Sequence, residues 1–282
     1  MNALYLVFII IGTSTQNVLK KGFTQKFGGK GIALFNALSY ASAIVFFVLT
    51  SSGLKWNPSI LPYSLGFAMG FGTATICSTL AVACGSLSLT SLITSYSLMV
   101  PTVYGLLFLK DPISIGLFPG LVLLVVSLVL INKKNECTQI SVKWLVYVAL
   151  AFGGNGMGAV IQKMQQVKFN GAFRSEFMIT ALFMAAVASG ALAVKSDRKN
   201  LGRYASQSWY LALMYGLANG MVNLFVMILS ARMPVSLMFP LISSGGIIVT
   251  YIISKFYYKE TLTRTQLAGF MLGIGSVILL NL

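Results

Sequence analysis

Several apolar stretches of this sequence carry polar side chains at helical spacing. Tyr215, Asn219 and Asn223 are each four residues apart, so a helix would align all three on one face. Polar residues within a membrane cost free energy, and they mark substrate paths or contacts between helices. Two interpretations of the amide pair are open: contact with a ligand or water in a cavity, or hydrogen bonds between helices.

Further hydroxyl and amide groups lie near the middle of four other apolar stretches. They are Thr13 and Asn17, with Gln16 between them, Ser95 and Tyr96, Asn155, and Ser243 with Ser244. Together with Tyr215, Asn219 and Asn223, they are the predicted substrate-binding residues. Close packing of helices through small residues is the alternative, and it applies above all to Asn155, which lies in the glycine-rich run "GGNGMG".

The sequence contains few of the residue types that catalyse reactions. The sequence has no histidine, so Ser-His and Cys-His catalysis is excluded and zinc binding is not favoured. We expect no enzyme activity, no metal and no cofactor. Of the five acidic residues, only Glu176 begins an apolar stretch. Glu176 is either half of an interfacial pair with Arg174, or a functional carboxylate that couples transport to protons or pairs with a substrate amine.

Composition indicates an integral membrane protein. The chain is 57% hydrophobic and only 9% charged, with a mean hydropathy of +0.85, whereas soluble domains have about 25% charged residues. The net charge of +15 comes from basic residues between apolar runs, for example Lys20 and Lys21 at the end of the first. They are predicted to anchor helices at the membrane surface, and no nucleic-acid partner is expected.

The apolar stretches predict ten membrane-spanning helices, since a helix needs about 20 residues to cross the hydrocarbon core. The predicted spans are 3–20, 31–51, 62–84, 89–109, 113–132, 143–162, 172–194, 207–230, 235–257 and 264–281. The connecting segments are too short for a soluble domain, so a functional site must lie within the bundle. The basic residues gather on the side opposite the termini, which predicts that both termini are outside.

The chain repeats part of its own sequence. "KDPISIGLFPGLVLLVVSLVLIN" (110–132) aligns without gaps with "KETLTRTQLAGFMLGIGSVILLN" (259–281), and Leu65–Gly70 aligns with Tyr215–Gly220. A weaker match joins Gly12–Lys21 to Gly154–Lys163. We predict two five-helix halves, 1–132 and 143–282, joined by a linker at 133–142. Because five is odd, the second half enters the membrane inverted, as in transporters that work by alternating access.

On these motifs the sequence resembles the drug/metabolite transporter superfamily, in its ten-helix EamA-type branch. The likeness lies in Asp111-Pro112 with Gly120 and in Glu260-Thr261-Leu262-Thr263 with Gly269; the first copy departs from the family's Glu-x-Leu-Thr turn. The resemblance implies ten helices around a central cavity and cytosolic termini. It also implies that spans 113–132 and 264–281 are peripheral, where they can form a homodimer.

The expected function is secondary transport of a small organic metabolite by alternating access, in the plasma membrane as a multi-pass protein. The substrate is expected to be neutral, zwitterionic or amine-bearing, for example amino-acid-like, because span 3–20 and its counterpart 143–162 contain no acidic residue. Proton coupling is left open. The alternatives are a lipid-carrier flippase, for which Lys163, Lys168 and Arg174 would hold headgroups, and a quaternary-amine (choline-like) transporter with an aromatic cage.

Overall fold

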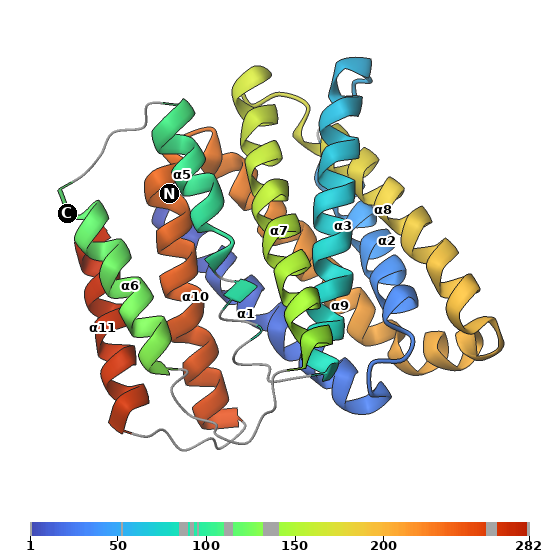
Figure 1. Ribbon diagram of the computed structural model, residues 1–282. Helices are drawn as coiled ribbons and strands as arrows, with labels where there is room; N and C mark the ends of the chain where they lie inside the picture. Colours follow the sequence, from blue (N-terminus) through green and yellow to red (C-terminus); the bar gives the residue numbers. More distant parts are fainter. Residues whose placement is uncertain are drawn as a thin grey trace.

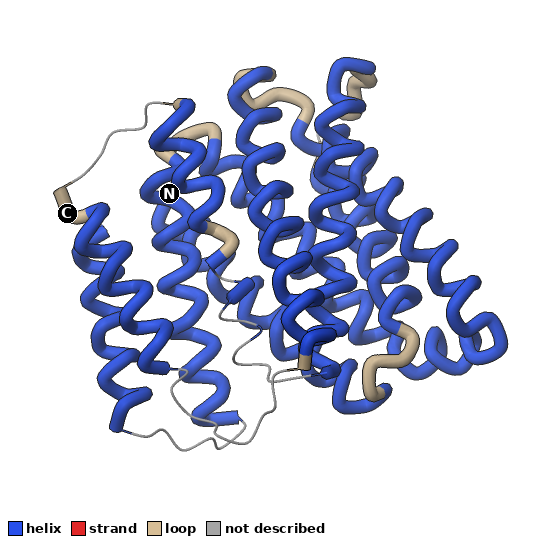
Figure 2. Tube along the Cα trace, viewed as in Figure 1, coloured by secondary structure: helices blue, strands red, loops and turns tan. Residues whose placement is uncertain are grey.

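The chain is an all-helical bundle. The computed structural model describes residues 2–51, 53–84, 90, 93–94, 96–109, 115–131, 141–257 and 264–280. Within these residues there are ten α-helices and two short 3-10 helices, and Figure 2 shows only helices and loops among them. The all-α prediction is therefore confirmed for the described part of the chain.

Each predicted span overlaps one helix. The helices are α1 (Asn2–Phe27), α2 (Ile32–Thr50), α3 (Leu61–Cys84), α5 (Met99–Phe108), α6 (Leu117–Ile131), α7 (Val142–Lys168), α8 (Arg174–Asp197), α9 (Leu201–Ser230), α10 (Val235–Tyr257) and α11 (Arg264–Leu280), with 3-10 turns at Pro58–Ile60 and Arg198–Asn200. Three of them, α1, α7 and α9, extend about two turns beyond the predicted ends. The predicted spans end where the apolar residues end. Lys and Gln are good helix formers, so these helices continue through the polar residues that follow or precede the apolar stretch.

Six helices are long and apolar enough to cross a membrane: α1, α2, α3, α7, α8 and α9, counted over the described residues. Large apolar side chains cover the outside of these helices; Leu49 is 78% exposed, Met69 66% and Phe183 62%. A soluble protein rarely exposes so much contiguous apolar surface. The fold and its surface are those of a helical membrane protein.

The two halves of the chain are interleaved. The most extensive helix pairs are α3 with α7, α6 with α11, α2 with α9, α2 with α8, and α1 with α9. Each of these pairs joins a helix from before residue 132 to one from after residue 142, as Figure 1 shows for α3 beside α7 and α6 beside α11. The main apolar core, which includes Tyr40, Phe47, Phe67 and Phe177, likewise draws on both parts of the chain.

The contact between α6 and α11 uses the repeated glycines and serines of the sequence. The Ser127 hydroxyl donates to the Gly269 carbonyl, and the Ser276 hydroxyl donates to the Gly120 carbonyl over 2.8 Å. In the gapless alignment above, Gly120 corresponds to Gly269 and Ser127 to Ser276. The two hydrogen bonds are therefore reciprocal, and they tie the helices together at equivalent positions.

The glycine-rich run of α7 makes a close backbone contact with α3. A β-carbon at Gly154 would lie 2.5 Å from the Gly70 carbonyl oxygen, and one at Gly70 would lie 2.9 Å from the Gly154 carbonyl oxygen. At Gly153, by contrast, a β-carbon would meet nothing within 4 Å. The run thus lets two helix backbones touch, as membrane helices do through small residues.

Candidate functional site

Four amide side chains form a hydrogen-bonded chain across three helices. Gln162 Nε2 of α7 donates to Asn223 Oδ1 of α9 over 3.2 Å. Asn223 Nδ2 donates to Asn219 Oδ1 over 3.1 Å and to the Asn219 carbonyl over 2.9 Å. Asn219 Nδ2 then donates to Gln16 Oε1 of α1 over 3.3 Å. We call these four residues the amide network.

The amide network is enclosed by the bundle. Asn219, Asn223 and Gln162 are 4%, 7% and 4% exposed. Gln16 is half-buried, but its Nε2 atom is shielded from solvent and has no hydrogen-bond partner among the described residues. A buried polar group without a partner costs about 1–3 kcal/mol. The network therefore holds a donor that an incoming acceptor could use.

Helical spacing places these side chains opposite one another. Tyr215, Asn219 and Asn223 line one buried face of α9, as the sequence predicts. The α1 backbone comes close to this face because position 12 is glycine: a β-carbon at Gly12 would lie 2.5 Å from Val222 Cγ2. Gln16 follows one turn later on the same side of α1, within reach of Asn219. The prediction that the amide pair turns inward is consistent with this geometry.

A lysine lies next to this face, inside α1. Lys20 Nζ donates to Ser78 Oγ of α3 over 3.0 Å and lies 5.9 Å from the centroid of the Tyr215 ring. Ser78 Oγ donates to the Thr75 carbonyl over 3.1 Å, and the hydroxyls of Thr75 and Tyr40 are hydrogen-bonded to each other. We call Tyr40, Thr75 and Ser78 the hydroxyl cluster. The sequence placed Lys20 at the start of a connecting segment; it lies within α1, which continues past it to Phe27.

Asn155 lies in a different contact. Its Nδ2 atom donates to Ser97 Oγ over 2.6 Å, which links α7 to the segment just before α5. Ser97 in turn donates to the Thr94 carbonyl. A β-carbon at Gly156 would lie 2.8 Å from Val100 Cγ2, so the two segments are tightly packed here. Asn155 is therefore a helix-to-helix contact separate from the amide network.

The remaining predicted binding residues are spread over the bundle. The Thr13 hydroxyl donates to the Ile10 carbonyl of its own helix over 2.9 Å, and Asn17 is half-buried on the same helix. The Tyr96 hydroxyl donates to the Val125 carbonyl over 3.4 Å, so this side chain is directed at α6 and not at the amide network.

Of the three predicted serines, two lie in α10. Ser243 is 5% exposed within α10. Ser244 is also part of α10, but its side chain is outside the described structure, and Ser95 is outside the described residues altogether. Of the predicted set, the structure thus brings together Tyr215, Asn219 and Asn223.

Glu176 lies in the first turn of α8. Its Oε1 atom accepts a hydrogen bond of 2.8 Å from the Lys55 amide in the segment between α2 and α3. Its sequence neighbour Arg174 donates from Nε to Gln166 Oε1 over 3.0 Å. Arg174 and Glu176 thus bond other segments rather than each other. Glu176 bonds the segment between α2 and α3, and Arg174 bonds α7.

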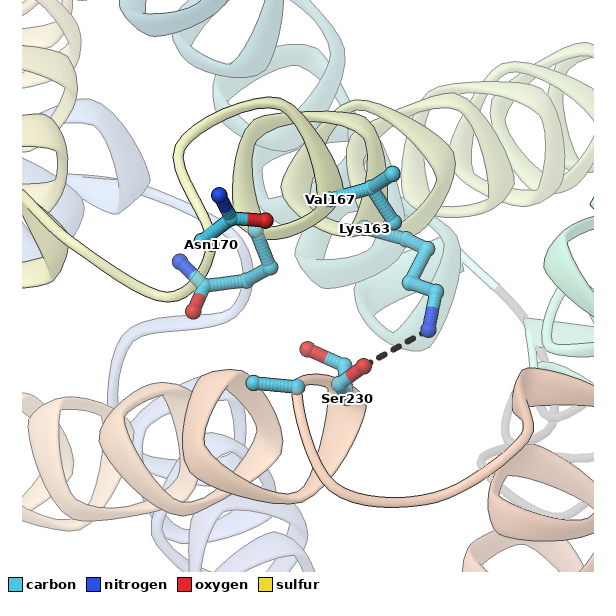
Figure 3. A pocket seen from close by; sticks show the side chains of 6 residues that line it. Lys163, Val167, Asn170 and Ser230 are labelled. Atoms are coloured by element: carbon cyan, nitrogen blue, oxygen red, sulfur yellow. Dashed lines mark hydrogen bonds between the residues drawn. The ribbon is translucent and has the colours of Figure 1, made fainter.

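A pocket of about 310 Å³ opens at the C-terminal ends of α7 and α9 (Figure 3). It is lined by Lys163, Gln166, Val167, Asn170, Ser230 and Ala231. Lys163 Nζ donates to the Ser230 carbonyl over 2.6 Å, the bond drawn in Figure 3. Because Ser230 ends α9, the ammonium lies at the negative end of that helix. The nearby connection is tightly wound, with positive φ at Asn170, Gly171 and Phe173.

Sequence reasoning missed Lys20 and Gln162. Each is the last residue of its predicted span, 3–20 or 143–162, and neither was named as a candidate site residue. A signal was present, because the match of Gly12–Lys21 with Gly154–Lys163 aligns Lys20 with Gln162. Two aligned polar residues at the ends of their spans were a signal for a shared inward-facing position.

Comparison with known proteins supports the fold only. The sequence matches no family model and no curated protein. A solved chain, described only as a crystal structure of a protein, superposes on it with a TM-score of 0.75 at 11% sequence identity. The match covers 97% of this chain and 98% of that one. The apolar surface and the long helices define the class as a helical membrane protein, and its helices are arranged as in that solved chain.

Proposed function

We propose that this protein is a secondary transporter that carries a small organic metabolite across the membrane by alternating access. In this proposal residues 1–132 and 143–282 are inverted five-helix repeats joined by the segment 133–142, as in the EamA-type branch of the drug/metabolite transporter superfamily. The substrate lies in a central cavity between them. The protein resides in the plasma membrane and dimerises through α6 and α11.

The amide network is the observation that carries the proposal. Four amides in an apolar bundle are costly, and polar side chains at such positions commonly serve a function. Gln16 Nε2 is unpaired among the described residues, and the network joins α1 from the first half to α7 and α9 from the second. A ligand bound there would contact both halves, as alternating access requires.

The pattern of helix contacts supports the inverted repeat. Exchanging α1 with α7, α2 with α8, α3 with α9, α5 with α10 and α6 with α11 turns most of the main contacts into others that are present. The exception is α10–α11, which has no α5–α6 counterpart of similar extent among the described residues. The α3–α7 pair becomes α9–α1, α2–α9 becomes α8–α3, and α1–α10 becomes α7–α5, while α2–α8, α5–α10 and α6–α11 are unchanged. The reciprocal hydrogen bonds of Ser127 and Ser276 obey the same exchange.

The exposed faces of α6 and α11 favour the proposed dimer contact. Phe118, Val122 and Val129 of α6 are 60%, 61% and 58% exposed, and Met271 of α11 is 61% exposed. These helices pack mainly on each other and lie at one side of the bundle in Figure 1. A lipid-facing apolar surface there can pair with a second copy without disturbing the central helices.

Uptake into proteoliposomes tests the proposal. Purified protein is expected to move at least one of labelled amino acids, choline or a nucleoside above the level of empty vesicles. Alanine replacements at Tyr96, Asn219, Ser243 and Ser244 are then compared at equal reconstitution. Loss of flux in Asn219→Ala is expected first, since Asn219 is central in the amide network. If all four variants transport normally the predicted binding set is wrong, and if no probe moves at all the transport proposal fails.

Proton coupling through Glu176 makes a separate prediction. Glu176→Gln keeps an acceptor for the Lys55 amide, so the fold is expected to persist, while the carboxylate that could exchange a proton is removed. Uptake driven by a pH gradient is expected to stop, whereas exchange of labelled for unlabelled substrate continues. The measurement is initial uptake with and without an imposed gradient. Gradient-driven uptake at the wild-type rate would exclude Glu176 from coupling.

A lipid-carrier flippase is the second candidate, and the pocket in Figure 3 is the observation in its favour. Lys163 lines that pocket, and Lys168 and Arg174 follow within the next turns of α7 and α8. Such a cationic end would hold an anionic headgroup while the lipid tail stays in the bilayer. Scrambling of a fluorescent anionic lipid in the same proteoliposomes, without uptake of any soluble probe, would favour this candidate over the carrier.

A further inference from the structure

Lys20 is a partly buried cation of α1 with few partners. It lies seven residues before the end of α1, which places it about 10 Å along the helix from that end. An ammonium carries three N–H donors. The Ser78 hydroxyl takes one, and the only other interaction of Lys20 among the described residues is with the Tyr215 ring.

The described surroundings supply Lys20 with no negative charge. Its neighbours are neutral hydroxyls and aromatic rings, and no described carboxylate contacts it. Partial burial removes part of the water around the ammonium, and neutral hydroxyls offset that cost less well than an opposite charge does. A position of this kind within a membrane is held for a function. A reversibly bound anionic ligand would balance the charge.

Gln16 provides a second donor at the same place. It precedes Lys20 by one helical turn, so the two side chains project from the same side of α1. Gln16 Nε2 is shielded from solvent and has no hydrogen-bond partner among the described residues, because the side chain's oxygen is the atom that binds Asn219. Two N–H donor groups, one of them charged, therefore lie one helical turn apart on the side of α1 that faces α9.

We infer that Lys20 and Gln16 form the subsite for the carboxylate of the transported molecule. One carboxylate oxygen accepts from Lys20 Nζ and the other from Gln16 Nε2, with Ser78 and Tyr215 beside them. A carboxylate fits better than a phosphate dianion because Lys20 brings a single positive charge, and it fits better than a cation, which Lys20 would repel. That the bound carboxylate belongs to a transported molecule rests on the proposed transport function. The inference narrows the substrate class to carboxylates.

Matched ligand pairs test this subsite in the purified full-length protein. Each pair keeps the size of the molecule and removes only the carboxylate: leucine with leucinamide, glycine betaine with choline, and propionate with propionamide. Inorganic phosphate is included as the dianion. Binding is measured by thermal shift and by calorimetric titration in detergent. At least one carboxylate is expected to stabilise the wild type, while its carboxylate-free partner has no effect.

Three variants assign the binding to Lys20. Lys20→Met is expected to weaken carboxylate binding by about 10- to 100-fold, the range for losing a charge-assisted hydrogen bond. Lys20→Arg keeps the charge and is expected to retain part of the affinity. Lys26→Met, which removes an exposed lysine from the same helix, is the matched control and is expected to bind like the wild type. If Lys20→Met fails to fold, Gln16→Met tests the second donor and is expected to weaken binding as well.

Two binding results and one uptake result would overturn the inference. One is equal carboxylate affinity in the wild type and in the folded Lys20→Met or Gln16→Met protein. The other is the absence of carboxylate binding at concentrations up to about 10 mM, whether or not neutral or cationic probes bind. Vesicle uptake separates failure of the subsite from failure of the transport proposal. Lys20-dependent binding without flux would refute transport alone. Flux of a neutral molecule in Lys20→Met would refute the subsite alone.

Discussion

Gly154→Leu is expected to prevent folding, whereas Gly153→Leu is expected to be tolerated. At Gly154 even a β-carbon would meet the Gly70 carbonyl oxygen at 2.5 Å and the Ala74 amide at 3.2 Å, and backbone atoms cannot move aside. The α3–α7 pair is the most extensive in the bundle, so separating these helices would disrupt the fold at its largest contact. Overpacking of a core by a few atoms already costs about 1–3 kcal/mol.

The adjacent glycine is the matched control. Gly153 is exposed on the outer face of α7, and a β-carbon there meets nothing within 4 Å. Replacing a helical glycine by a better helix former favours the helix by up to about 1 kcal/mol. Size-exclusion profiles and thermal unfolding in detergent measure both variants. Equal stability of the two would show that the backbones of α3 and α7 are not in contact.

Asn223→Leu is expected to abolish uptake in proteoliposomes. Asn223 is the middle of the amide network: it accepts from Gln162 and donates to Asn219. Leucine has a similar size but offers neither donor nor acceptor, so two buried amides lose a partner at about 1–3 kcal/mol each. Thermal stability is expected to fall together with flux, since the same bonds join α7 to α9.

A double replacement separates the two effects. In Asn223→Leu combined with Gln162→Leu, both members of one hydrogen bond become apolar, and such a change can be nearly neutral for stability. We expect part of the lost thermal stability to return while uptake stays absent. Recovery of uptake along with stability would mean that the amide network only holds the helices together.

Periodicity made the fold and part of the site predictable. The all-helical architecture and the positions of the helices follow from apolar segments of membrane-spanning length. Asn219 and Asn223 could be placed on one inward face because the spacing of four residues fixes their direction regardless of neighbours. The close-packed glycine run was also foreseeable, since glycines at helical spacing bring backbones together.

Partners across helices were not predictable in the same way. Sequence spacing gives no information on which side chain of α1 meets Asn219, and the answer, Gln16, depends on the α1–α9 contact made at Gly12. Lys20 was predicted to end its span because the span was measured by its apolar residues and stopped at the first charge. The helix itself continues to Phe27. Tyr96 had the right chemistry but is directed at Val125, which only the packing of α6 determines.

The interleaved packing bears on how this protein is made. A ribosome releases α1, α2 and α3 long before α7, α8 and α9, their principal partners, exist. The early helices must therefore wait in the bilayer with their polar faces provisionally covered by one another, lipid or insertion machinery. Native assembly therefore begins late in synthesis. A chain interrupted at its midpoint would lack the partners of its helices, and we expect proteases to degrade it.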